Sequence, residues 1–177
     1  MSPPAQPLPS TAFATTQSSG EDRFEAWRSG ISVLFDVAPL TQSAPLEDFQ
    51  ARVEAVHLGQ LLLGDLRFGA QRFARNQARA AQDGLDHYLV QWYRDGGFIG
   101  QHSDQDDLRV RAGDVVVFDT ARTQQTVAQG SRVLSLHTAQ TGASAKLWQR
   151  VQVWIRASAS VNPAASCCAP RRSCCSR

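Results

Sequence analysis

The sequence predicts a mainly β-sheet fold, a sandwich or small barrel, preceded by one short amphipathic helix. Short segments of alternating or β-branched residues recur between residues 46 and 138, and Gly and Asp turn signals separate them. Prolines are absent from 46 to 162, which leaves room for an uninterrupted sheet. The 177 residues are enough for one ordinary domain with tails.

The helix is expected over roughly residues 21–35. Ser18 precedes Glu21 by three residues, which is the spacing of a capping box at a helix start. The apolar residues that follow recur at helical period on one face: Phe24, Trp27, Ile31 and Leu34. Such a stripe is typical of an amphipathic helix.

The pattern changes to that of β-strands after residue 46. Alternation or β-branched content predicts strands over residues 49–55, 61–68, 87–94, 98–99, 108–110, 115–118, 125–128 and 132–138. Asp95-Gly96-Gly97 predicts a hairpin, because glycine tolerates positive φ. A second hairpin is expected around Gly130. Residues 71–82 stay ambiguous, since their Ala, Arg and Gln content favours a helix that ends quickly at Gly84.

The two ends of the chain differ in composition from the middle. Residues 1–19 contain four prolines among small polar residues and are interpreted as a disordered arm. All sixteen acidic residues lie between Glu21 and Asp119, and eight basic residues follow Asp119. The net charge of +2 selects no partner for the whole chain. No apolar run is long enough for a membrane span, and no secretory signal opens the chain, so a cytoplasmic protein is expected.

Several motifs in this order resemble the N-terminal sensor domain of AraC-type transcriptional regulators. The run from Gly113 to Arg122 is similar to the family's pattern G-D-x-x-x-x-D-T-x-R-P, with Thr123 where a proline is common. The resemblance covers about residues 20–138. The motif residues that carry it are Phe24, Trp27, Gly64, Asp65, Gly113, Asp114, Asp119 and Arg122.

The same run has a physical interpretation that does not depend on the family. Gly113 permits a tight turn, and the Asp114 carboxylate can accept backbone N–H bonds within it. Asp119 and Arg122 can brace the end of the strand through a charged hydrogen bond. On this interpretation every motif residue supports the fold rather than a binding site.

The resemblance implies a cupin-like barrel, that is a double-stranded β-helix or jelly-roll, over residues 20–140. In that family the barrel binds a small-molecule effector or mediates dimerisation, so a homodimer or a heterodimer with full-length relatives is expected. It implies no enzyme activity, no cofactor, no catalytic residue and no membrane partner. The family's DNA-binding domain carries two helix-turn-helix units, and no such pattern follows Thr138. We therefore expect no sequence-specific DNA binding by this chain alone.

The tail after residue 140 allows more than one interpretation. Residues 141–177 are basic, rich in Cys, Arg, Ser and Ala, and are expected to be poorly ordered and frame-shifted. As a helix, residues 146–156 would be basic and amphipathic, able to lie on a partner, an anionic lipid surface or nucleic acid. As a strand, Val151, Val153 and Ile155 would alternate. The preferred interpretation is that the tail is out of frame, so that neither pattern was selected. The four cysteines of the tail are expected to be exposed thiols.

Aromatic residues around the central strands are the candidates for an effector pocket. The aromatic residues that would supply apolar area are Tyr88, Trp92, Tyr93 and Phe98. Gln91, Arg94 or His102 would orient the polar end of the effector. The alternative is that half of these aromatic residues are ordinary core, because alternate positions of a strand must face inward.

A second function class is a small metal-dependent cupin enzyme. His102, Asp104 and His137 could meet inside a barrel and hold a divalent metal. The four histidines form no H-x-H pair, so no metal site is predicted. A third class is a stand-alone interaction module that uses the basic tail.

Overall fold

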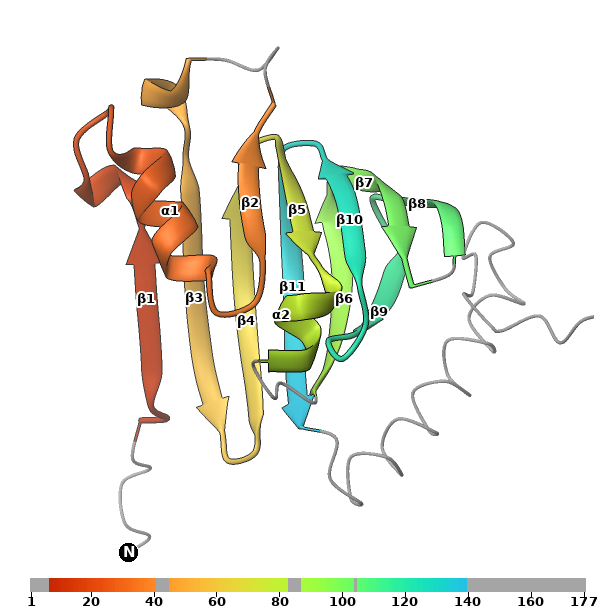
Figure 1. Cartoon of the computed structure of the whole chain (residues 1–177). Helices are drawn as coiled ribbons and strands as arrows, with labels where there is room; N and C mark the ends of the chain where they lie inside the picture. Colours follow the sequence, from red (N-terminus) through yellow and green to blue (C-terminus); the bar gives the residue numbers. More distant parts are fainter. Residues whose placement is uncertain (1–6, 41–44, 83–86, 104, 140–177) are drawn as a thin grey trace, which may run out of the picture.

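The computed structural model describes residues 7–40, 45–82, 87–103 and 105–139 (Figure 1). In these residues eleven strands form two antiparallel sheets, with orders β1-β3-β4-β11-β6-β9 and β2-β5-β10-β7-β8. The six-stranded sheet contains β1 (Ser10–Ala14), β3 (Ala51–Leu58), β4 (Leu61–Phe68), β6 (His87–Asp95), β9 (Val115–Asp119) and β11 (Ser131–Ala139). The five-stranded sheet contains β2 (Asp36–Pro39), β5 (Gln71–Arg75), β7 (Gly97–His102), β8 (Gln105–Arg111) and β10 (Gln124–Ala128). The helices are α1 (Arg23–Ile31), α2 (Gln77–Gln82) and the 3-10 helices η1 (Thr15–Gln17) and η2 (Leu46–Asp48).

The chain moves repeatedly from one sheet to the other. Among the described strands, consecutive ones pair directly in β3–β4 and in β7–β8, and each remaining connection crosses between the sheets. Two facing antiparallel sheets joined in this way form a jelly-roll barrel. The mainly β, cupin-like fold with an N-terminal helix is therefore confirmed.

Two predicted hairpins are instead connections from one sheet to the other. Gly96 joins β6 to β7 and Gly130 helps to join β10 to β11, yet the members of each pair lie in different sheets. The two corners touch, since the Gly97 amide donates to the Ser131 hydroxyl at 3.0 Å. A turn glycine predicts where the chain changes direction. It does not predict which strand the next strand will pair with, because strand pairing depends on the packing of both sheets.

Part of the expected disordered arm is ordered. Ser10–Ala14 forms β1, which pairs with β3 along its whole length at the edge of the six-stranded sheet. Thr15 is fully buried, and its hydroxyl accepts the Ala51 N–H at 2.9 Å. The prediction of disorder was wrong for residues 10–17, because pairing with β3 supplies the hydrogen bonds that composition alone could not reveal.

The N-terminal helix is shorter than expected. It begins after Asp22, and no side chain caps it, so the capping box at Ser18 is not formed. After Ile31 the chain turns into β2, and Phe35 packs edge-on against Phe73 at 5.8 Å. The ambiguous segment 71–82 contains both kinds of structure, first β5 and then α2.

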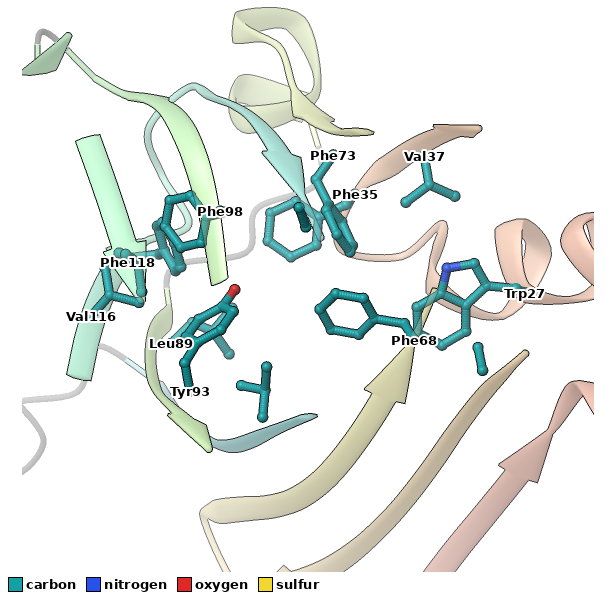
Figure 2. Packing of buried hydrophobic residues seen from close by; sticks show 14 of the residues in the cluster. Trp27, Phe35, Val37, Phe68, Phe73, Leu89, Tyr93, Phe98, Val116 and Phe118 are labelled. Carbon is teal, nitrogen blue, oxygen red and sulfur yellow. The ribbon is translucent and has the colours of Figure 1, made fainter. Parts of the chain in front are cut away.

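Aromatic side chains fill the space between the sheets (Figure 2). Trp27 of α1 stacks near Phe68 with 6.3 Å between ring centroids, and its indole N–H donates to the Gln71 side-chain oxygen at 2.7 Å. Phe98 links the sheets, because its ring lies 5.4 Å from that of Tyr93 and 5.7 Å from that of Phe118. The motif residues Phe24 and Trp27 thus close one side of the core, each 1% exposed.

Within the described part of the chain, no helix has the length and apolarity that a membrane span requires. The amphipathic segment 146–156 and the four cysteines lie outside the described residues.

Candidate functional site

The candidate effector residues do not share one pocket. Tyr88, Trp92 and Arg94 alternate on β6 with the buried Leu89 and Tyr93, so they lie on the outer face of the six-stranded sheet. Trp92 is 43% exposed, and the Arg94 guanidinium lies 5.6 Å from the centre of its ring.

Two further candidates, Phe98 and His102, face the interior from β7. Phe98 is 3% exposed and belongs to the apolar core. The His102 ring meets Phe118 edge-on at 5.3 Å, and its Nε2 accepts the Asp119 N–H at 3.3 Å. The core alternative was therefore correct for Phe98, while His102 lies at a more polar level of the barrel.

Polar side chains gather inside the barrel at the end where β11 finishes and β10 begins. Ser135 lies opposite Gln91 in the register of β11 with β6, and Gln124 lies opposite His102 in the register of β10 with β7. Ser135, Thr126 and Gln124 are 0%, 3% and 6% exposed. We call this set the polar end of the barrel, and its members are Gln91, His102, Gln124, Thr126, Ser135 and His137.

The polar end is held by long hydrogen bonds. Ser135 Oγ lies 3.3 Å from His137 Nε2, and the Gln124 amide donates to the Thr126 hydroxyl at 3.5 Å. The Tyr93 hydroxyl donates to the Gln91 side-chain oxygen at 3.3 Å. Buried polar groups are costly unless they are well bonded, so these contacts leave room for better partners. His87 Nδ1 is also buried, and within the described residues it has no hydrogen-bond partner.

Burial keeps the side chains of His137 and Tyr93 uncharged at neutral pH. It lowers the pKa of His137 from 6.5 to about 4, and the nearby His87 adds a smaller lowering. Burial also raises the pKa of the Tyr93 hydroxyl, which stays protonated. The site thus offers hydroxyls, amides and a neutral imidazole, which suit an uncharged polar ligand.

The Ser135–His137 contact resembles half of a nucleophile–base pair, but its chemistry is poor. A general base works best with a pKa near the working pH. With a pKa of about 4, His137 is too weak a base to activate a serine hydroxyl at neutral pH. The contact therefore fits a hydrogen-bonding role.

Buried Arg75 belongs to the scaffold at this end of the barrel. Arg75 is 1% exposed, and its guanidinium donates to the carbonyl oxygens of Thr120 and Leu34 at 2.5 and 2.9 Å. It ties the end of β5 to the loop after β9 and to the chain after α1.

The motif run makes the contacts that its chemistry predicted. Gly113 has φ +94°, and the Asp114 carboxylate accepts the Arg111 N–H at 2.8 Å. Asp119 accepts from the Arg122 guanidinium at 3.3 Å.

The other motif positions also support the sheet. Gly64 is buried in β4, where an added Cβ would come within 3.0 Å of the Leu66 side chain. The neighbouring Asp65 pairs with Arg132 of β11 at 2.7 Å. This hydrogen bond and the positive charge of Arg132 lower the pKa of Asp65.

The metal alternative has no support in the described residues. No three His, Cys, Asp or Glu side chains in them are grouped to hold a metal ion. Asp104, the proposed carboxylate ligand, lies outside the described residues.

Two hollows lie on the surface of the barrel. One, of about 640 Å³, is bordered by Arg67, Arg94 and Arg132. The other, of about 860 Å³, crosses the outer face of the five-stranded sheet past Arg72 and Ile99. Neither hollow is lined by His102, Ser135 or His137, whereas the second hollow also touches Thr126 of β10.

Comparison with known families agrees with this fold. The model of a family described as the AraC-binding-like domain matches residues 25–169. The chain belongs to this family. The resemblance that the motif residues suggested is thereby confirmed. The match to the AraC-binding-like family runs beyond Thr138, contrary to the expectation that family sequence ends there.

An AraC-like activator of known structure has the same architecture. The AraC-like transcriptional activator CuxR superposes with a TM-score of 0.69 at 18% identity, over 74% of this chain and 47% of that one. The chain thus spans about half the length of that activator. KdgF from Halomonas sp. covers 55% of this chain and 90% of its own at 16% identity, with a TM-score of 0.38. An RmlC-like cupin from Shewanella frigidimarina covers 52% and 78% at 12% identity, with a TM-score of 0.39. No curated protein matches the chain.

Sequence reasoning found only part of the polar end. It placed the effector on aromatic residues of β6 and β7 with Gln91, Arg94 or His102 at the effector's polar end, and it named His137 only as a metal ligand. The available signal was the alternation in β11, where Val133, Ser135 and His137 share one face and Leu134 and Leu136 share the other. Hydrophobicity suggests that the leucines face inward, whereas the structure buries Ser135 completely.

Proposed function

We propose that this chain is the effector-sensing part of an AraC-type transcriptional regulator, and that its effector is a small uncharged polar molecule. The family match supports the sensing role. The observation that carries the site is the polar end itself, where buried, uncharged hydrogen-bonding groups from both sheets face the same interior. Of the candidates named from the sequence, Gln91 and His102 keep a place in this site.

The proposed mechanism is a shift of population. An effector that replaces the long Ser135–His137 and Gln124–Thr126 contacts gains better hydrogen bonds in one arrangement of the sheets. Gln124 sits on β10 and Ser135 on β11, in different sheets, so one ligand would link both. That arrangement becomes more populated, and the rest of a regulator responds to it.

The remaining parts of the proposal follow from the separate roles of the sensing and DNA-binding domains in AraC-type regulators. We propose that the chain acts in the cytoplasm, performs no catalysis and forms homodimers or heterodimers with full-length relatives. We also propose that the sensing barrel does not read operator DNA by itself. Specific binding to an operator at moderate salt in a mobility-shift assay with this chain would contradict that part.

The site is tested by a ligand screen followed by matched variants. Uncharged polyols, amides and nucleosides are compared with carboxylates and phosphates for their ability to raise the melting temperature. For any stabilising compound, calorimetry compares Gln124→Leu, which alters the polar end, with Gln125→Leu at the exposed neighbouring position. We expect Gln124→Leu to weaken binding roughly tenfold or more and Gln125→Leu to leave it unchanged. Equal binding by both variants, or stabilisation by charged compounds alone, would contradict the proposed site.

A further inference from the structure

Three arginines lie side by side on the outer face of the six-stranded sheet, on the neighbouring strands β3, β4 and β11 (Figure 1). Arg52 of β3 is opposite Arg67 of β4 in the register, and Arg67 is opposite Arg132 of β11. Each arginine alternates with a buried residue of its strand, so all three point outward. We call them the arginine row. Adjacent strands are about 4.8 Å apart, and like charges directly opposite each other destabilise a sheet. The arginine row therefore needs negative charge beside it.

The chain itself supplies part of that negative charge. Arg52 pairs with Glu54, and Arg132 pairs with Asp65 at 2.7 Å. Arg67, the middle member of the row, is exposed and forms no ion pair with any residue that the structure describes. Its guanidinium thus keeps its hydrogen-bond donors for a partner from outside the barrel.

A β-bulge adds a fourth arginine next to the row. The register of β11 with β6 shifts just after Arg132. Tyr93 and Asp95 of β6 are both paired with β11, so Arg94 between them is the extra residue of the bulge. Bulges re-aim side chains and are frequent next to functional sites. The Arg94 guanidinium lies 5.6 Å from the centre of the Trp92 ring, a cation–π contact that holds it on the outer face.

The carboxylate of Asp65 shows that these arginines act on one place. The hydrogen bond from Arg132 is the largest influence on the pKa of Asp65 and lowers it, against the opposing effect of burial. The positive charges of Arg132, Arg94 and Arg67 lower this pKa further. One carboxylate thus lies in the field of three guanidiniums, and its single negative charge balances only one of them.

The same three arginines border the hollow of about 640 Å³. A hollow of this size can take a small molecule. The carboxylates of Asp48 and Asp95 also line it, and neither forms an ion pair within the described part of the chain. Asp95 instead accepts the Gly96 N–H at 2.9 Å. These two acids reduce the net charge of the hollow, so a ligand gains its affinity from direct contact with the guanidiniums.

We propose that Arg67 and Arg94 form an anion site, separate from the polar end, for a small molecule that carries two negative charges on oxygen atoms, as a phosphate monoester or a dicarboxylate does. Two guanidiniums without an acidic partner match two negative charges, and each offers forked N–H donors that bind such oxygens in pairs. β4 and β6 flank β11, about 10 Å from each other, so the two long side chains can converge on one group above Arg132. Binding offsets the repulsion within the arginine row and gives the barrel a second ligand besides the effector.

Thermal unfolding of the full chain with anionic probes tests the site. Inorganic phosphate, phenyl phosphate and succinate are each compared with sodium chloride at the same ionic strength and at mildly alkaline pH. We expect at least one of these dianions to raise the melting temperature above that in chloride, because it binds the folded state. The probe that does so distinguishes a phosphate ligand from a dicarboxylate.

Matched double variants assign the effect to the proposed residues. Arg67→Gln/Arg94→Gln should abolish the rise in melting temperature, and calorimetry should show affinity for the stabilising probe weakened by about tenfold or more. Arg72→Gln/Arg109→Gln removes the same charge from exposed positions of the five-stranded sheet and should keep both properties. In chloride alone, Arg67→Gln should not lower the melting temperature, because it relieves repulsion in the arginine row, and this shows that the barrel still folds.

The outcomes separate this site from the polar end and from other anions. Gln124→Leu should leave binding of the anionic probe unchanged. Stabilisation no greater than that by chloride, or equal stabilisation of the two double variants, would overturn the proposal. Binding of duplex DNA that depends on Arg67 and Arg94, without binding of any small probe, would assign these arginines to a nucleic-acid backbone and overturn it as well.

Discussion

His137 lies inside the barrel, where water cannot solvate an imidazolium. Its folded-state pKa is about 4, below the 6.5 of an ordinary histidine. As pH falls through 6.5, His137 of the unfolded chain binds a proton, whereas His137 of the folded chain stays neutral. Protonation therefore favours the unfolded state. The contribution of His137 is thus fully present above pH 6.5 and is lost as pH falls toward 4.

This gives a pH-dependent prediction. Between pH 7.5 and 4.5 the free energy of unfolding should fall by about 2 to 3 kcal/mol through His137. Urea denaturation at several pH values measures it. The variant His137→Gln should show a shallower fall in this window, whereas His57→Gln, at an exposed position of β3, should behave as the unmodified chain. Identical slopes for all three proteins would show that burial of His137 does not set the acid sensitivity.

Gly96 has no side chain, and this allows the chain to turn tightly between β6 and β7 next to Gly130 and Ser131. Its φ is +74°, and an added Cβ would collide with the Gly130 carbonyl oxygen and the Ser131 side chain. We expect Gly96→Ala to cost about 2 to 4 kcal/mol, because backbone strain and a steric clash add. Gly59→Ala, with φ +70° and open space around the Cβ, should cost only about 1 kcal/mol. Denaturation curves compare the two, and equal losses would rule out the clash as the cause.

At the scale of elements, a single buried hydroxyl joins η1, which follows β1, to the start of β3. Thr15 Oγ1 accepts the Ala51 N–H at 2.9 Å and donates to the Ala51 carbonyl at 3.3 Å. Thr15→Ala leaves both backbone groups without this partner and should cost about 1 to 3 kcal/mol. Thr16→Ala, exposed in the same 3-10 helix, serves as the control and should be near neutral. Hydrogen exchange should speed up in β1 for the first variant alone. Unchanged protection of β1 in Thr15→Ala would contradict this role.

Local sequence pattern predicted some strands accurately and did not predict others. The strands at residues 61–68 and 87–94 were predicted within a residue or two, because β-branched and alternating residues mark them strongly. β1 was missed, since its sequence STAFA carries no strong alternation and its stability comes from β3. The hairpin predicted around Gly130 was wrong for a similar reason. Which strands pair with each other depends on contacts between residues far apart in the sequence, and β10 and β11 lie in different sheets.

At the scale of the whole molecule, Phe98 holds the two sheets together. It lies on β7 and contacts Tyr93 and Phe118 of the opposite sheet. Phe98→Ala should cost about 3 to 5 kcal/mol, because it opens a cavity between the sheets. Its neighbour Ile99 is 51% exposed, so Ile99→Ala should cost far less. Thermal and urea unfolding measure both, and similar losses would mean that Phe98 does not bridge the sheets.

The sequence by itself determined the mainly β fold, the turn positions at Gly96 and Gly113, and the family, because these depend on local propensity and short motifs. Only the tertiary structure decided which face of each strand is buried. Alternation sorts residues onto two faces, but it cannot rank them when both faces contain apolar residues. In β11 the inward face holds Ser135 and His137, and the outward face holds Leu134 and Leu136. The packing of the opposite sheet makes that choice, and it thereby creates both the polar interior and the apolar outer face.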